Sequence, residues 1–393
     1  MPRDGARIAI IGGGLGGLTA AALLRKAGFE AKVYEQTPVL ERIGAGIQLG
    51  PNLVKVLERI GVADRLRKLA VRPERWVSRK WDTGEELLSY PLGDTAEQRY
   101  GAPYLVVHRG DFHALLIDAV DPGAVAFGKC LVELEPFGEI IRLVFEDGTT
   151  TEADIVIGAD GVYSRVREVL LGPEKPRFAG QVAHRAIFPA GGMQIEDCSK
   201  WWAEDGRIFC TYYLTDSRDE IFIVSGSFEP EWAHPTSSVP ANLDALRATF
   251  ADFHPEIREL LGACPAASKW AMFDREPLPL WSRGRIVLLG DACHPMTPYM
   301  GQGAAMALED AAVLTRCLQS SPNDHTDAFR LYEANRKART AKVQSTSRLN
   351  TWLRDEASTW VSGQADPDWL FGYDAFNEPL LPPSSLPSGC AAG

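Results

Sequence analysis

The sequence predicts an α/β protein in which a Rossmann-like dinucleotide-binding domain is interleaved with a second, sheet-based domain and followed by a C-terminal helical segment. Three observations predict this fold. A strand, a glycine turn, a helix and a second strand occupy the first 35 residues, short buried strands return twice downstream, and an aromatic-rich run of strands separates the two returns. The length of 393 residues exceeds the size at which one hydrophobic core usually keeps growing, which favours two domains.

The N-terminal pattern is a βαβ unit. Residues 6–11 form an apolar, β-rich run that ends in three consecutive glycines, and residues 15–26 have helical spacing before Gly28 stops the helix. Residues 30–35 then predict a second strand. The unit has the length of about 30 residues that is typical of the motif.

The next elements are shorter. Residues 51–60 predict a helix that opens with a proline, and residues 73–99 are mixed and strand-like. Residues 105–108 predict a strand before a helix that Asp111 can cap. Residues 126–150 alternate apolar and polar side chains around an Asp-Gly hairpin turn.

The predicted secondary structure changes character twice in the second half of the chain. Residues 154–157 predict a buried strand and residues 163–171 a helix, after which residues 177–276 predict strands rich in aromatics. Residues 285–289 return to the parallel-strand style, and helices are predicted at 304–319 and 325–354. We therefore assign residues 1–72, 100–176 and 277–324 to the dinucleotide-binding domain, 73–99 and 177–276 to the sheet-based substrate domain, 325–377 to the helical segment, and 378–393 to a flexible tail.

Composition and charge exclude several classes of protein. A formal net charge of −11 argues against a nucleic-acid-binding or anionic-membrane surface, both of which need clustered Lys and Arg. The seven cysteines form no CxxC pair and have no spacing with histidine that suits zinc, so we expect reduced thiols and no metal site. The N-terminus lacks a signal peptide, and no stretch approaches the roughly 18 apolar residues of a membrane span. We expect a cytoplasmic monomer or homodimer.

The glycine turn matches the GxGxxG pattern of dinucleotide-binding proteins. Gly12, Gly14 and Gly17 would permit a tight turn, a close approach to a pyrophosphate and tight packing of the helix that Leu15 opens. Glu35 ends the second strand, where a carboxylate accepts hydrogen bonds from both ribose hydroxyls of FAD or NAD. A glycine loop without a ligand and an exposed strand-end glutamate are the alternatives.

Two later motifs point to a family. The segments GADGVYSRVR at 158–167 and GDACHP at 290–295, together with the glycine turn, resemble those of the class A flavin monooxygenases, the relatives of para-hydroxybenzoate hydroxylase. The resemblance spans nearly the whole chain. It implies bound FAD, with NADH or NADPH and O2 as cosubstrates. It also implies that Asp291 holds the ribityl chain and that Asp160 lies in a segment associated with FAD and pyridine-nucleotide binding, a structural turn being the alternative for either.

Further FAD contacts are expected along the same cavity. Glycines at 300–304 open a helix whose backbone N–H groups would face the pyrimidine end of the flavin, where negative charge grows on reduction. The segment 44–49 resembles a flexible stretch beside the isoalloxazine ring. Glu309 and Asp310 are expected to be solvated or capping groups. The remaining predicted cofactor-binding residues are Arg42, Gly46, Arg109, Pro298, Gly301, Gly303 and Ala304.

Within the family, the resemblance is closest to bacterial 6-hydroxynicotinate 3-hydroxylases, with 3-hydroxybenzoate and salicylate hydroxylases more distant. It places Tyr212 in the substrate pocket and matches Cys198 to a cysteine of those enzymes. The sequence departs from their pattern where Gln48, Ile208 and Tyr299 replace pocket histidines. We predict a catalytic set of Tyr212, Gln48, Tyr299 and His294. His184, Arg185 and Arg207 are weaker candidates for contacts with the substrate, because local hydrogen bonds and surface ion pairs explain most such residues.

The implied reaction is hydroxylation of an aromatic or pyridine carboxylate through a C4a-hydroperoxyflavin, with 6-hydroxynicotinate 3-hydroxylation and decarboxylation, a step of nicotinate degradation, as the leading interpretation. Hydroxylation of 3-hydroxybenzoate or salicylate is the alternative within the family. A flavin redox sensor without hydroxylase activity, and an NAD dehydrogenase that uses only the N-terminal fingerprint, are alternatives of other classes. No catalytic base is identified.

Overall fold

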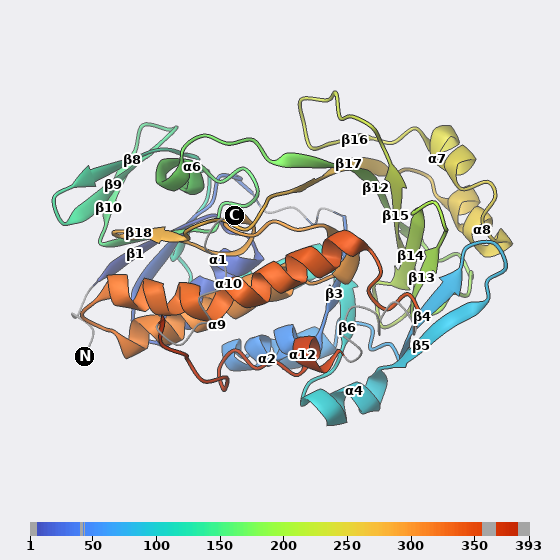
Figure 1. The fold of residues 1–393 in the computed structure, drawn as a ribbon, viewed down its shortest axis with the longest axis horizontal. Coiled ribbons are helices and arrows are strands. Elements are labelled where there is room, and N and C mark those ends of the chain that lie inside the picture. The colour runs from blue at the N-terminus through green and yellow to red at the C-terminus, as the bar shows by residue number, and fades with distance from the viewer. Residues whose placement is uncertain (1–5, 40–41, 43, 356–366, 384–393) are drawn as a thin grey trace, which may run out of the picture.

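The computed structural model describes residues 6–39, 42, 44–355 and 367–383. Within these residues, a six-stranded and an eight-stranded sheet form the two ends of an elongated molecule, and long helices run along one side (Figure 1). The α/β class predicted from the sequence is confirmed. None of the helices in the described ranges is long and apolar enough to cross a membrane.

The six-stranded sheet has the strand order β18-β19-β11-β1-β2-β7. Strand β1 (Arg7–Ile11) pairs in parallel with both β2 (Glu30–Tyr34) and β11 (Ile155–Gly158). Its apolar run suits a strand that is covered on both faces. The remaining strands are β19 (Ile286–Leu288), which is parallel to β11, and the edge strands β7 (Val125–Ala126) and β18 (Ser282–Arg283).

Three helices pack against one another beside this sheet. Helix α1 (Leu15–Lys26) packs against α9 (Gly303–Ser320), and α9 packs against the long helix α10 (His325–Leu349). Figure 1 shows α10 running from the six-stranded sheet toward the strands of the other sheet. Residues distant in sequence therefore meet beside β1.

The eight-stranded sheet has the strand order β16-β17-β12-β15-β14-β13-β4-β5. Two separate chain segments contribute to it, which is the interleaving that the sequence predicts, although the domain boundaries themselves stay a prediction. The strands are β4 (Arg75–Lys80), β5 (Glu86–Pro91), β12 (Arg177–Pro189), β13 (Cys198–Trp202), β14 (Ile208–Tyr213), β15 (Glu220–Phe228), β16 (Ser238–Pro240) and β17 (Ser268–Asp274).

Smaller elements complete the fold. Strands β3 (Gly46–Leu49) and β6 (Leu105–His108) form an antiparallel pair, and β8 (Leu131–Phe137), β9 (Ile140–Phe145) and β10 (Thr150–Ala153) form a three-stranded sheet. The short helices are α2 (Pro51–Ile60), α3 (Ala63–Arg67), α4 (Gly93–Tyr100), α5 (Arg109–Asp118), α6 (Arg165–Leu171), α7 (Leu243–Thr249), α8 (Pro255–Ala263), α12 (Asp368–Phe371) and the 3₁₀ turns η1 (Gly290–Ala292) and η2 (Pro298–Met300).

Two regions that the sequence predicts as strand-like contain helices. Residues 93–100 form α4, which ends at Gly101 in the left-handed conformation with φ 79°. Helices α7 and α8 lie within the segment 177–276. The side chain of Asn242 caps α7 by accepting from the Ala245 N–H, and Pro255 opens α8. These capping signals were present in the sequence, and the aromatic-rich pattern around them hid them.

Two further boundaries differ from the expectation. Asp111 does not cap α5, because the ring of His108 accepts from the Gly110 N–H and the helix starts at Arg109. Helix α10 ends at Leu349, before Asn350 with a φ of 50°, and not at residue 354. Of the predicted tail, residues 384–393 lie outside the described residues.

Candidate active site

One cavity of about 420 Å³ is lined by strands of the eight-stranded sheet and by the turns that follow β1, β11 and β19 of the six-stranded sheet. Its wall contains most of the residues that the sequence predicts for cofactor binding and three of the four predicted catalytic residues. The predicted residues that line it are Gly14, Leu15, Gly46, Gln48, Arg109, Tyr212, Asp291, Pro298, Tyr299, Gly301, Gly303 and Ala304.

The glycine turn between β1 and α1 forms one wall, and its backbone leaves no room for side chains. A Cβ on Gly12, whose φ is 106°, would lie 2.4 Å from the carbonyl oxygen of Ala159. A Cβ on Gly17 would lie 2.0 Å from the carbonyl oxygen of Gly12. These two glycines therefore hold the turn closed, so that Gly14 and the start of α1 reach the cavity.

Glu35 lies at the carboxyl end of β2, beside the glycine turn. Its Oε2 accepts from the Gly13 N–H at 2.6 Å, and its Oε1 accepts from the Thr37 N–H at 2.8 Å and from the Thr37 hydroxyl. Glu35 is not part of the cavity wall. Its carboxylate is fixed at the position where a dinucleotide-binding fold binds the adenosine ribose.

Asp291 and Arg109 place opposite charges on the wall. Burial raises the pKa of the Asp291 carboxyl, and His294 and Arg109 oppose this rise. Burial lowers the pKa of the Arg109 guanidinium, and Asp291 opposes this fall. In the described part of the chain neither side chain has a hydrogen-bond or ion-pair partner. A polar ligand with hydroxyl and phosphate groups, such as FAD, fits this pair and the glycine turn.

Two predicted cofactor-binding side chains make other contacts. Asp160 accepts from the Ser164 hydroxyl at 2.5 Å and from the Val166 N–H at 3.1 Å, so both carboxylate oxygens bond within the turn before α6. Burial nevertheless raises the pKa of the Asp160 carboxyl. Arg42 pairs with Asp111 at 2.8 Å and Glu220 at 3.0 Å. Neither Asp160 nor Arg42 belongs to the cavity wall.

Behind the wall, Glu309 on α9 is completely buried, so the expectation that it is a solvated or capping group is wrong. Its carboxylate accepts from Arg336 and Arg339 at 2.7 Å each and from the Asn52 amide at 2.7 Å. Both arginines lie on α10. The expectation failed because helical spacing identified α9 but not the helix that covers its polar residues.

Asp310 is also completely buried, which corrects the same expectation. It accepts from Arg336 Nε at 2.7 Å and from the backbone N–H of Gly290 at 3.0 Å, and its Oδ2 lies 2.5 Å from His294 Nε2. Gly290 directly precedes Asp291 in η1. The buried ionic network of Glu309, Asp310, Arg336, Arg339 and His294 therefore supports the loop that carries Asp291.

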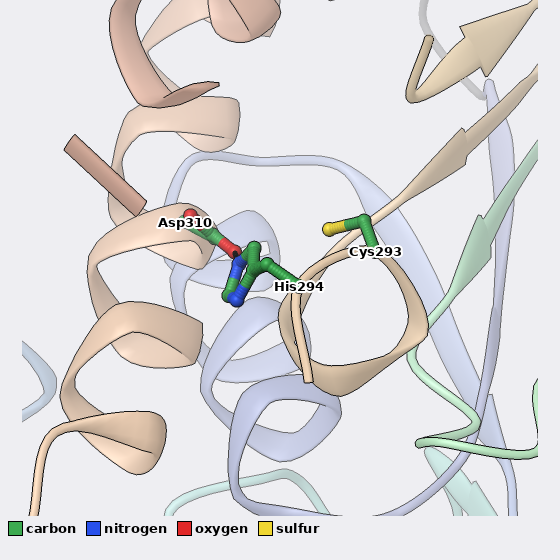
Figure 2. Close-up of side chains that lie close together, drawn as sticks. All are labelled: Cys293, His294 and Asp310. Carbon is green, nitrogen blue, oxygen red and sulfur yellow. Dashed lines mark hydrogen bonds and ion pairs between the residues drawn. The ribbon is translucent and has the colours of Figure 1, made fainter. Parts of the chain in front are cut away.

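Cys293, His294 and Asp310 lie close enough for their ligand atoms to fall within 4.8 Å of one another. Figure 2 shows the ring of His294 directed at Asp310, with Cys293 beside it. The Asp310 carboxylate is already bound to Arg336, and the Cys293 thiol lies 3.4 Å from the carbonyl oxygen of Gly290. The ionic network explains this cluster without a metal. His294 does not line the cavity, unlike the other three predicted catalytic residues.

Tyr212 on β14 and Gln48 on β3 line the opposite end of the cavity, which the eight-stranded sheet and the β3–β6 pair form. Tyr104 donates to Gln48 Oε1 at 2.7 Å, and Gln48 Nε2 lies 3.7 Å from the sulfur atoms of Cys198 and Cys210. Burial raises the pKa of Tyr212 well above its ordinary value. The Tyr212 phenol is therefore protonated near neutral pH and available as a hydrogen-bond donor.

Two cations also line this end of the cavity. Arg185 on β12, for which a surface ion pair was the favoured interpretation, stacks over the ring of Trp270 at 5.0 Å and has no ion-pair partner in the described ranges. Lys200 on β13 was missed as a site residue. Its only sequence signal is a single lysine between the residues CS and WW of a buried strand. Arg207, by contrast, pairs with Asp205 and Asp252.

Of the two remaining candidates, one lines this cavity and the other does not. Ile208 lines the cavity, where its side chain is apolar. His184 lies 3.2 Å from the Ser225 hydroxyl and lines a separate cavity of about 410 Å³. Burial lowers the pKa of His184 to about 4, so its ring is neutral near pH 7.

Comparison with known proteins places these features in context. Residues 6–347 match the FAD binding domain family. The chain is 52% identical over 380 residues to a 6-hydroxynicotinate 3-monooxygenase of Bordetella bronchiseptica, covering 95% of this chain and 97% of the relative. It is 50% identical to the 6-hydroxynicotinate 3-monooxygenase of Pseudomonas fluorescens, covering 96% and 97%.

Solved structures agree with the sequence relatives. A salicylate hydroxylase in complex with its substrate is 25% identical, with a TM-score of 0.80 and coverage of 95% of this chain and 97% of the other. The HpxO protein of Klebsiella pneumoniae in complex with FAD and uric acid is 27% identical, with a TM-score of 0.79 and coverage of 92% and 96%.

Proposed function

The chain belongs to the FAD binding domain family and is an FAD-dependent aromatic monooxygenase that uses NAD(P)H and O2, and we propose that it hydroxylates 6-hydroxynicotinate at C3 with loss of the carboxyl group. The observation that carries this proposal is the 52% identity to a 6-hydroxynicotinate 3-monooxygenase over nearly the full length of both proteins. A single cavity that contains both the glycine turn and Tyr212 supports it, because reaction requires cofactor and substrate in contact.

We assign the glycine-turn end of the cavity to FAD. The turn and the start of α1 would bind the pyrophosphate, Glu35 the adenosine ribose and Asp291 the ribityl chain. Gly303, Ala304, Arg109 and Pro298 line the same end, and the N–H groups of the first two would be available to the flavin ring. When bound, FAD supplies the oxidation chemistry by accepting hydride from NAD(P)H and activating O2.

We assign the other end to the aromatic acid. Tyr212 would donate a hydrogen bond to the ring hydroxyl, and Gln48 would orient the ring through its amide, which Tyr104 holds in place. Tyr299, which belongs to η2, completes the wall at this end. These residues align the ring and exclude water, which are the tasks that the protein contributes to such a reaction.

The eight-stranded sheet would then form the substrate domain, with the boundaries predicted from the sequence. A cytoplasmic location and a monomeric or homodimeric state belong to the same proposal. The location is supported by the six described cysteines, all of which are free thiols.

Hydroxylation of 3-hydroxybenzoate or salicylate is the second candidate. It is favoured by the chemistry of the cavity, because no histidine lines the cavity among the residues that the structure describes, and Gln48, Ile208 and Tyr299 are neutral. Neutral side chains suit a benzene ring as well as a pyridine ring.

The test is substrate-stimulated NADH oxidation by the FAD-loaded protein across 6-hydroxynicotinate, 3-hydroxybenzoate and salicylate, with mass spectrometry of the products. The proposal requires that 6-hydroxynicotinate gives a product lighter by CO2 and heavier by one oxygen. Turnover of a benzoate in preference would establish the second candidate. Oxidation of NADH without any hydroxylated product would indicate a redox sensor.

A further inference from the structure

Lys200, at the substrate end of the cavity, is a buried cation without a counter-ion among the residues that the structure describes. Lys200 is 2% exposed and lines the cavity wall. Its ammonium group donates to the carbonyl oxygen of Tyr299 at 3.3 Å and to the Asn350 Oδ1 at 3.2 Å, and lies 3.9 Å from the centre of the Trp202 ring. In the part of the chain that the structure describes, no carboxylate lies within ion-pair distance of it.

This environment leaves Lys200 incompletely satisfied. An ammonium group has three donors, and the two hydrogen bonds that it makes are both longer than the usual 2.7–2.9 Å for a charged donor. Burying a charge without a partner is costly, and natural proteins rarely keep one without a function. One donor and most of the charge therefore remain for a ligand in the cavity.

The groups that face Lys200 from neighbouring elements are neutral. Cys210 on β14 is paired with Lys200 in the sheet, and burial raises the pKa of the Cys210 thiol to about 12. Ser78 is its partner on β4, and burial also raises the pKa of Tyr299 on η2. Asn350, which follows α10, is uncharged at every pH. No described neighbour supplies the missing negative charge.

We propose that Lys200 binds the carboxylate of the aromatic substrate and makes the enzyme selective for aromatic acids over their neutral analogues. The inference rests on the proposed function only for the class of substrate, an aromatic acid. The protonated ammonium group of Lys200 is complementary to the carboxylate of the substrate, which is ionised at all pH values near neutrality. The ring hydroxyl is matched instead by neutral donors, the Tyr212 phenol and the Gln48 amide.

Arg185 is the competing cation in the same cavity, and it differs in its surroundings. Both cations lie over a tryptophan ring, Arg185 at 5.0 Å from Trp270 and Lys200 at 3.9 Å from Trp202. The side chain of Arg185 is less completely buried than that of Lys200. A guanidinium also stays protonated in proteins, whereas burial shifts the pKa of a lysine readily. Lys200 therefore gains more from a carboxylate.

The assignment has a consequence for pH. Burial lowers the pKa of Lys200 to about 7, and only Cys210 opposes this fall. A bound carboxylate favours the protonated form and raises that pKa. Affinity for the acid is therefore highest below pH 7 and falls as the pH rises above 7, because binding must then be accompanied by uptake of a proton.

The experiment measures binding to the FAD-loaded protein through the change in flavin absorbance. The ligands are 6-hydroxynicotinate and 6-hydroxynicotinamide, which differ in the carboxylate alone, and 3-hydroxybenzoate with its amide as a second pair. The variants are Lys200→Met, Lys200→Arg and Arg185→Met. Lys269→Met is the matched control, because Lys269 lies on the same sheet but pairs with Glu229 and lines the separate cavity.

We expect Lys200→Met to weaken binding of the acid about 10- to 100-fold, the usual worth of a charge-assisted hydrogen bond, with the affinity for the amide unchanged. Lys200→Arg should keep part of the preference for the acid, and Lys269→Met all of it. The proposal is overturned if Lys200→Met weakens acid and amide equally or neither, or if Arg185→Met alone removes the preference.

A measurement on the unmodified enzyme covers the case in which Lys200→Met does not fold. Affinity for the acid should fall between pH 7 and pH 9 while affinity for the amide stays constant, and equal profiles for acid and amide would overturn the proposal. Failure of the proposed function is recognised separately. If 3-hydroxybenzoate binds tightly and 6-hydroxynicotinate yields no product, the substrate assignment is wrong, and the acid-to-amide comparison with 3-hydroxybenzoate still tests Lys200.

Discussion

The network behind the cavity and the cavity wall differ in how their buried charges are paired. Behind the flavin end, Glu309 and Asp310 are completely buried, and each carboxylate contacts an arginine of α10. At the substrate end, Lys200 and Arg185 have no ion-pair partner among the described residues. The carboxylates of the network are paired with arginines, which offsets the cost of burying them and holds a loop in place, whereas an unpaired buried charge carries a cost that a ligand can relieve. Asp291 and Arg109 at the flavin end are also unpaired among the described residues. Paired charges therefore belong to the scaffold, and unpaired charges line the cavity where ligands would bind.

Breaking the paired network has the largest expected effect. Arg336→Met leaves Glu309 and Asp310 with fewer partners in a site that water does not reach. Removing one partner of a buried ion pair costs about 3–5 kcal/mol. Urea unfolding should therefore show a loss of that size in the free energy of unfolding.

The control is Arg65→Met, which removes an exposed ion pair with Asp118. Exposed pairs contribute about 0–1 kcal/mol, so this variant should unfold almost like the unmodified protein. Equal losses in the two variants would mean that the network behind the flavin end does not stabilise the fold in the way proposed.

The next effect concerns the backbone of the flavin end. A Cβ at position 17 meets the carbonyl oxygen of Gly12, which is backbone and cannot rotate away. Overpacking costs about 1–3 kcal/mol, so Gly17→Ala should weaken FAD binding by about 10- to 100-fold. Flavin content and fluorescence titration measure this loss. Gly262→Ala in α8, where a Cβ meets nothing within 4 Å, should bind FAD normally.

A smaller effect should follow acidification. Burial opposes ionisation of Asp310, but His294 and Arg336 outweigh it and lower its pKa to about 2, below the ordinary value of 3.8. A carboxyl whose pKa is lower in the folded state supplies stability above its unfolded pKa and loses it as the pH falls toward the folded value. The free energy of unfolding should therefore drop between pH 4 and pH 2. Asp310→Asn, already less stable at pH 6, should show a shallower drop, and an identical slope would exclude this contribution.

The sequence predicted the flavin end better than the substrate end. Gly12, Gly17 and Asp291 belong to local motifs, in which a turn and its neighbouring strand fix the backbone wherever the rest of the chain lies. The strand β1 and the helix α1 follow from periodicity within a few residues. These features depend on short-range chemistry and are accessible without a structure.

The misses depend on contacts across the chain. Glu309 and Asp310 have the sequence pattern of exposed helical residues, and only α10, which follows them, converts them into a buried network. Lys200 lies outside the three motifs that predict the cofactor site, and its lack of a counter-ion results from neutral partners on β4, β14 and η2. His294 belongs to a recognised motif, but its ring is directed at Asp310 (Figure 2), and His294 does not line the cavity. Side-chain contacts between distant strands and helices cannot be predicted from the local sequence.

The contrast between paired and unpaired charge also predicts an effect of opposite sign. Replacing an unpaired buried cation by an apolar side chain of similar length should stabilise the fold, by about 1 kcal/mol. The folded-state pKa of Lys200 is lowered to about 7 from 10.5. The unfolded state therefore binds more protons between these values, and the stability of the unmodified protein should rise over that range of pH. Lys200→Met should lose this rise.

The most direct test is thermal unfolding of the FAD-loaded unmodified protein and of Lys200→Met at pH 7, each with and without saturating 6-hydroxynicotinate. The account predicts that the variant unfolds at the higher temperature without the acid, and that the acid raises the unfolding temperature of the unmodified protein far more than that of the variant. A variant that unfolds at a lower temperature without the acid, and gains as much from it, would contradict the account and place Lys200 in the scaffold.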